Sequence, residues 1–173
     1  HNITTYEADI VYGKRVMIDC GLNIAKPTKK LYFDLEVDPR GEFPDPNFAK
    51  KRILSVGCID QDGSRFFFSE EDEAEMIGKF LDLASKYHLM IGWNSGMFDR
   101  PYLENRCNNL GIQVDWFLYP HIDLLYLYKK SFTREEESYR LADLARTLFG
   151  IEVTDYESQR KVEILWELSL IHI

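Results

Sequence analysis

Apolar and polar residues alternate from Leu31 to Val37, and this period of two predicts a β-strand. The odd-numbered residues of the segment are apolar, whereas the even-numbered ones are Tyr32, Asp34 and Glu36. One face of the strand is therefore expected to pack in the core while the other carries polar groups. Further apolar segments predict strands at residues 53–59, 65–68 and 89–93.

Apolar residues at helical spacing predict helices after these strands. The first is expected to have Ser69 as its N-cap, an acidic first turn, and an end near residue 87. A second is expected to start near Asp99 and to stop at Gly111. Further helices are expected over residues 121–130, over residues 139–149 and from about residue 155.

The order of these elements indicates the fold class. Strands come first and then alternate with helices, which is typical of an α/β domain with a mixed β-sheet and helices on its faces. A chain of 173 residues is expected to form a single globular domain. We divide it into a lead-in segment over residues 1–30 and the main domain over residues 31–173.

Composition and charge narrow the range of functions that the chain could have. Apolar residues make up 45% of the chain and charged residues 29%, as in ordinary globular proteins. The net charge of −8 argues against a protein that coats nucleic acid through bulk positive charge. No apolar stretch is long enough to span a membrane, and no signal-peptide pattern opens the sequence. With three scattered cysteines and no zinc-ligand spacing, we expect reduced thiols and a cytoplasmic location.

Four carboxylates lie in three separate segments. Asp34 and Glu36 point the same way from one strand, Asp99 lies at a strand-to-helix turn, and Tyr139 and Asp143 are spaced i, i+4 on the helix side opposite its apolar face. Each feature alone has a simpler interpretation. The strand and helix faces could point to water, and Asp99 could serve as a helix N-cap.

Taken together, the four carboxylates fit one chemistry. Hard divalent cations such as Mg²⁺ take oxygen ligands, and two such ions stabilise the attacking and leaving oxygens in phosphodiester hydrolysis. Without cations, carboxylates in one cleft would repel each other and a nucleic acid backbone. An acidic chain can therefore bind a nucleic acid substrate if metal ions offset the repulsion between its carboxylates and the nucleic acid backbone.

Three segments resemble the motifs of the DEDD 3′–5′ exonucleases, in order and spacing. Phe33-Asp34-Leu35-Glu36 is similar to the first motif, Asn94 to Asp99 to the second, and Tyr139-x-x-x-Asp143 to the third. The tyrosine version is indicated, because the histidine version would have His at the position of Ser138. The flanks, including Gly92-Trp93-Asn94, Phe98 to Leu103, residues 6–10 and His121 to Leu124, resemble the proofreading domain of family B DNA polymerases.

The resemblance implies a ribonuclease-H-like fold, in which residues 31–173 form a 3′–5′ exonuclease domain. It implies two ions, Mg²⁺ or Mn²⁺, with Asp34, Glu36 and Asp143 on one ion, and with Asp34 and Asp99 serving the second. Tyr139 would orient the attacking water.

The resemblance also implies the substrate contacts. Asn94 and Phe98 would hold a single-stranded or frayed DNA 3′ end, with Phe98 stacking on a base, and Leu35 would press between the terminal bases. For Asp123 we expect a helix-start or structural role rather than a metal-ligand role.

The resemblance leaves alternatives open. The domain could be a catalytically inactive nucleic-acid-binding or scaffold domain of the same fold, or an RNA-trimming exonuclease. The sequence holds no polymerase palm motifs, and it begins with His1. We therefore expect the exonuclease region of a longer family B polymerase, acting on primer-template DNA, rather than a stand-alone relative.

Overall fold

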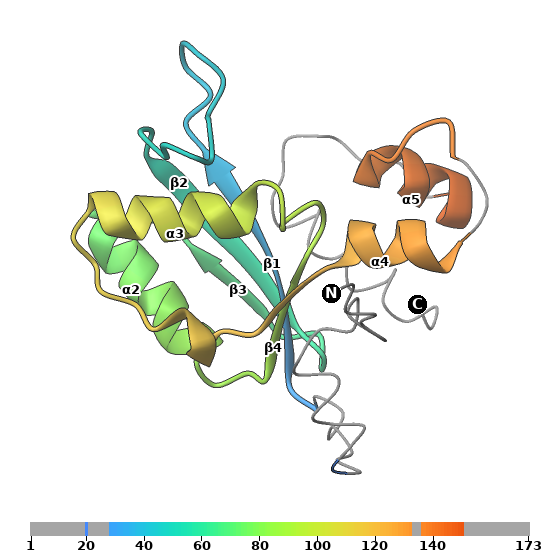
Figure 1. Ribbon diagram of the computed structural model, residues 1–173, viewed down its shortest axis with the longest axis horizontal. Helices are drawn as coiled ribbons and strands as arrows, with labels where there is room; N and C mark the ends of the chain where they lie inside the picture. The colour runs from blue at the N-terminus through green and yellow to red at the C-terminus, as the bar shows by residue number, and fades with distance from the viewer. Residues whose placement is uncertain (1–19, 21–27, 133–135, 151–173) are drawn as a thin grey trace, which may run out of the picture.

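A five-stranded mixed β-sheet forms the centre of the computed structural model, which describes Cys20, residues 28–132 and residues 136–150 (Figure 1). The order of strands across the sheet is β3-β2-β1-β4-β5. β1 pairs antiparallel with β2 and parallel with β4, which confirms the predicted mixed sheet. The strands span Lys30–Val37 (β1), Ile53–Asp60 (β2), Arg65–Phe68 (β3), Leu89–Gly92 (β4) and His121–Asp123 (β5).

Helices α2 (Glu73–Ala84) and α3 (Asp99–Asn109) cover one face of the sheet (Figure 1). The odd-numbered residues of β1 point to this face, where Phe33 packs against Phe80 with 5.9 Å between ring centroids. Burial of these aromatic and aliphatic side chains provides most of the hydrophobic stabilisation of the domain.

Helices α4 (Leu124–Ser131) and α5 (Leu141–Phe149) lie on the other side of the sheet (Figure 1). Tyr32 of β1, Leu124 of α4 and the fully buried Ala145 of α5 belong to one apolar cluster. Because Asp34 and Glu36 alternate in phase with Tyr32, they face the same side as α4 and α5. The sheet thus separates the large core from the polar face of β1, as the alternation predicts.

Two helix starts differ from the prediction. The first helix is capped by Asp72, whose carboxylate accepts hydrogen bonds from the Ala74 and Glu75 amides, and not by Ser69. The segment expected to be helical over 121–130 begins as strand β5, which pairs with β4, and becomes helical only after Asp123. Sheet pairing wins there because a free edge of β4 offers hydrogen-bond partners that a local helix does not use.

The described parts contain one short 3₁₀ helix, η1 (Trp116–Leu118). Cys58 and Cys107 are buried and Cys20 is exposed, all three as free thiols. None of the helices in the described ranges combines the length and apolar composition that a membrane span requires. The predicted lead-in segment lies mostly outside the described residues, as does the helix expected from about residue 155.

Candidate active site

Strand β1 carries the first pair of carboxylates on its polar face. Asp34 lies opposite Gly57 and Glu36 opposite Ser55 in β2, and the register shifts between Glu36 and Val37. An irregularity of this kind turns the side chains at the end of a strand, and such bulges often lie beside functional sites. The Oδ2 atom of Asp34 is buried, whereas the residue as a whole is partly exposed.

A tight turn leads from β4 into α3. A side chain at Gly92 would place a Cβ only 2.5 Å from the Cβ of Ser95, so the close return of the chain requires glycine. Asn94 adopts a φ of 56°, the left-handed region that asparagine tolerates better than most residues. The buried Ser95 hydroxyl lies 2.8 Å from Nε2 of His121 in β5. The turn thereby fixes the segment that precedes Asp99.

Asp99 is the first residue of α3 rather than its N-cap, which is Phe98. Only 6% of Asp99 is exposed, and its Oδ1 accepts a hydrogen bond from the Leu35 amide at 3.2 Å. A buried carboxylate bonded to a strand amide is not a simple cap, so the second motif is joined directly to the first. The N-cap interpretation of Asp99 is therefore wrong, because Phe98 is the N-cap and Asp99 already belongs to the helix.

Phe98 lies beside a groove of about 380 Å³ formed against the end of β1. Its ring stacks on the Tyr102 ring, with 5.4 Å between centroids and 28° between planes. The exposed Phe43 ring lies 6.2 Å away on the other side of the groove. The lining residues are Leu35, Glu36, Val37, Pro39, Gly41, Phe43, Pro44 and Phe98.

Tyr139 lies outside helix α5, contrary to the expected helix over 139–149. The N-cap of α5 is Arg140. Trp93 Nε1 donates a hydrogen bond to the Tyr139 carbonyl oxygen at 3.1 Å. Arg140 itself is extended, with φ of −68° and ψ of 136°, so the helix begins only at Leu141. The predicted helix end is confirmed, since Gly150 closes α5 with a φ of 67°.

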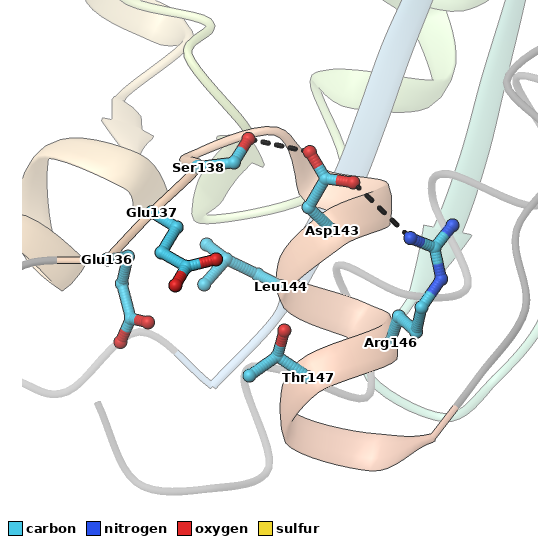
Figure 2. Close-up of a pocket in the computed structure, with 7 residues that line it drawn as sticks. All are labelled: Glu136, Glu137, Ser138, Asp143, Leu144, Arg146 and Thr147. Atoms are coloured by element: carbon cyan, nitrogen blue, oxygen red, sulfur yellow. Dashed lines mark hydrogen bonds and ion pairs between the residues drawn. The ribbon is translucent and has the colours of Figure 1, made fainter.

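The carboxylate of Asp143 makes a hydrogen bond and an ion pair with residues close to it in the sequence. Ser138 Oγ donates to Asp143 Oδ2 at 2.6 Å, and Arg146 forms an ion pair with Oδ1 at 3.7 Å (Figure 2). The carboxylate lines a hollow of about 630 Å³. Ser138 occupies the position at which the histidine version of the motif would have its histidine. Its bond to Asp143 could not be predicted from the sequence pattern.

The structure brings together some predicted site residues and separates others. Leu35, Glu36 and Phe98 share the groove, Asp99 bonds the backbone of β1, and Asn94 lies in a different hollow beside α4. In the part of the chain that the structure describes, no three His, Cys, Asp or Glu side chains converge on a point that could hold a metal ion. Asp143 shares the sheet side of Asp34 and Glu36 but is bonded to Ser138 and Arg146.

Two residues near the candidate site, Asp123 and His121, have structural roles. Asp123 caps α4 by accepting hydrogen bonds from the Leu125 and Tyr126 amides, which confirms its expected helix-start role, and it also accepts one from the Gly96 amide. His121 is partly buried beside Ser95, and this burial, with the charge of Arg100, lowers its pKa to about 4. The imidazole is therefore neutral near pH 7.

Comparisons with known proteins identify the superfamily and the fold. Residues 31–167 match the model of the RNase H superfamily. A DNA polymerase of Thermococcus kodakarensis is 33% identical over 126 residues, covering 64% of this chain and 7% of that protein. A DNA polymerase of Pyrococcus glycovorans is 30% identical over 128 residues, covering 65% of this chain and 16% of that one.

Among solved structures, the family B DNA polymerase of Pyrobaculum calidifontis superposes with a TM-score of 0.68 and 22% identity. The match covers 96% of this chain and 29% of the polymerase, so the chain spans less than a third of that protein and a smaller share of the two curated relatives. The predicted ribonuclease-H-like fold is thereby confirmed. The chain belongs to the RNase H superfamily, and part of it is similar in sequence to DNA polymerases of archaea.

Proposed function

We propose that this domain is a metal-dependent 3′–5′ exonuclease that removes nucleotides from single-stranded or mismatched DNA 3′ ends. The observation that carries the proposal is the hydrogen bond from the Leu35 amide to Asp99. It joins the carboxylate of the second motif to the strand residue that separates Asp34 from Glu36. Membership of the RNase H superfamily and similarity to DNA polymerases support a nuclease activity.

The proposed ligands are Asp34, Glu36, Asp99 and Asp143. Their oxygen donors are of the kind that Mg²⁺ and Mn²⁺ prefer, so the chemistry of the donor set fits these ions. When bound, two ions would stabilise the attacking and leaving oxygens of the scissile phosphodiester. Asp143 would have to exchange its contacts with Ser138 and Arg146 to take part. The ion pair with Arg146 is long and solvent-exposed, so its loss costs little.

Tyr139 is proposed to orient the attacking water, as in the tyrosine version of the motif. Its hydroxyl lies 3.5 Å from the Glu136 amide, a long contact, and its ring lies beneath the Lys129 ammonium at 4.3 Å. A phenol held by its ring, with a hydroxyl only weakly bonded, is suited to accept a new hydrogen-bond partner. The backbone bond from Trp93 keeps this residue close to the turn that carries Asn94.

The groove between Phe98 and β1 is the proposed place for the terminal nucleotide. Phe98 offers a ring for base stacking, and Leu35 also lines the groove. A terminal base must leave the duplex to reach such a groove, which favours ends that are single-stranded or mismatched. Because the relatives are far longer DNA polymerases, we also propose that a polymerase domain belongs to the same full-length protein and supplies primer-template DNA.

The test uses the whole chain and a 5′-labelled DNA strand. We expect shortening from the 3′ end with Mg²⁺ or Mn²⁺, none with EDTA, and loss of cleavage in Asp34→Ala and Asp143→Ala. The matched control is Asp82→Ala, an exposed carboxylate on α2, which should cleave like the unmodified chain. Full activity in EDTA, or in Asp34→Ala, would overturn the proposal.

A second candidate function is a catalytically inactive nucleic-acid-binding domain. It is favoured by the absence of three converging carboxylates in the described residues. Binding of a DNA strand without metal-dependent shortening would support it. An RNA-trimming activity is distinguished by competition between ribose and deoxyribose strands of one sequence, since a preference for ribose would identify it.

A further inference from the structure

A basic and aromatic surface lies on helix α4, next to the turn that carries Asn94. The Lys130 ammonium lies 4.5 Å from the centre of the Tyr126 ring, and the Lys129 ammonium lies 4.3 Å from the centre of the Tyr139 ring. Tyr126 and both lysines are exposed. We call these three residues of α4 the lysine–tyrosine surface.

The two lysines differ from the ion-paired cations of the domain. Arg40, Lys79, Arg100, Arg106 and Arg146 each form an ion pair with a carboxylate. Within the described ranges, neither Lys129 nor Lys130 has such a pair, although the chain carries a net charge of −8. Their positive charge therefore remains available to an anionic partner.

A hollow of about 280 Å³ lies between this surface and the turn that carries Asn94. Its walls come from the 94–97 turn and from α4, and Met97, 73% exposed, stands at its edge. The only carboxylate among its lining residues is Asp123, whose oxygens accept three backbone amide hydrogen bonds, so its charge is largely compensated. The lining residues are Asn94, Gly96, Met97, Asp123, Leu125, Tyr126 and Lys129.

We propose that the lysine–tyrosine surface binds the single-stranded nucleic acid a few nucleotides before its 3′ end. Lys129 and Lys130 would pair with backbone phosphates, and a base would lie in the hollow against Tyr126 and Met97. Cations interleaved with aromatic rings are the combination that holds a single strand regardless of its sequence. The inference rests on the proposed function, because it extends the path of the same substrate beyond Asn94.

The salt dependence of binding tests the proposal without any cleavage. Fluorescence anisotropy would measure the affinity of the whole chain for a labelled thymidine strand of about 12 nucleotides, in EDTA, over a series of salt concentrations. Each lost phosphate contact reduces the slope of log K against log salt by about 0.7 for single strands. We therefore expect the Lys129→Gln/Lys130→Gln double variant to lower the slope by about 1.4.

Two further variants make the result specific. Lys130→Gln alone leaves the Lys129–Tyr139 contact intact and should lower the slope by about 0.7. The control Lys86→Gln removes an exposed lysine just beyond α2, on the other side of the sheet, and should leave the slope unchanged. Equal slopes in the double variant and the Lys86 control would overturn the proposal, as would the absence of any binding by the unmodified chain.

The outcomes also separate this inference from the proposed function. A reduced slope in the double variant, together with a chain that never shortens DNA, would support the binding surface and refute the exonuclease. Metal-dependent shortening with an unchanged slope would refute the binding surface alone.

Discussion

Asp99 in α3 accepts a hydrogen bond from the backbone amide of Leu35 in β1, with 3.2 Å between Oδ1 and the amide nitrogen. The bond is buried and joins segments that are 64 positions apart in the chain. It holds the start of α3 against the strand that carries Asp34 and Glu36. A single carboxylate thus has a structural task that can be separated experimentally from its proposed role toward metal.

Substitutions at Asp99 should separate stability from catalysis. Asp99→Asn keeps an oxygen acceptor for the Leu35 amide, so its free energy of unfolding should stay near that of the unmodified chain. Asp99→Ala leaves a buried amide without its acceptor and should cost about 1–3 kcal/mol. Both variants should lose exonuclease activity. Urea denaturation and the cleavage assay measure the two effects, and equal stability of the two variants would contradict the structural role.

Tyr139→Phe should slow cleavage while leaving DNA affinity nearly unchanged. The phenol is proposed to position water, and such groups contribute roughly 10²–10⁴-fold to a rate. Its ring would still lie under Lys129, so the strand path should persist. Single-turnover cleavage gives the rate and anisotropy in EDTA gives the affinity. An unchanged rate would show that Tyr139 has no part in the chemistry.

The Glu73–Arg106 ion pair should be important for stability. Both carboxylate oxygens of the buried Glu73 bind the guanidinium, at 2.9 and 2.6 Å, and one also accepts from the Ile53 amide. The hydrogen bonds that Arg106 donates to Glu73 raise the pKa of Arg106. Glu73→Ala should lower the free energy of unfolding by about 3–5 kcal/mol, because it leaves a largely buried cation without its partner.

The control for that prediction is an exposed ion pair on the same helix. Lys79 of α2 contacts Glu70 and Glu75 at the surface. Lys79→Ala should change the free energy of unfolding by no more than about 1 kcal/mol. Similar losses in the Glu73 and Lys79 variants would mean that burial does not govern the strength of these pairs here.

His121 should make the domain less stable in mild acid. Its pKa is about 4 in the folded chain, against 6.5 for an unperturbed histidine. Between those values the unfolded chain binds more protons, so the free energy of unfolding falls as the pH is lowered through this window. Urea denaturation at several pH values should show a smaller pH dependence in His121→Gln. The exposed His88→Gln variant is the control and should keep the full dependence.

Phe98→Ala should reduce cleavage of single-stranded ends with little change in metal requirement. Phe98 stacks on Tyr102 beside the groove, and base stacking on such a ring contributes about 1–3 kcal/mol. Phe117→Ala is the control, because Phe117 is 94% exposed on η1, away from the groove. Initial rates are compared on single-stranded, mismatched and fully paired primers. Equal rates on all three in the unmodified chain would refute action on frayed ends.

Much of the fold could be predicted from local pattern. The alternation around Asp34 predicts both the strand and the face on which the carboxylates lie, because side chains alternate across a strand whatever the rest of the chain does. Gly150 marks the end of α5 because a left-handed residue is needed there. The first residues of the helices are harder to predict from the sequence. Ser69 and Asp72 both suit an N-cap, and packing of Glu73 against Arg106 favours the second.

The amino-acid sequence alone is enough to identify the composition of the candidate site, namely its carboxylates, its tyrosine and its aromatic residues, and their order along the chain. Which of these groups contact one another depends on the folded chain. Asp99 accepts a hydrogen bond from the Leu35 amide, Asp143 accepts one from Ser138, and the Tyr139 carbonyl accepts one from Trp93. These partners are distant in sequence or compete with a local helix, and such choices depend on which backbone and side-chain groups remain to be satisfied after the sheet and helices have packed.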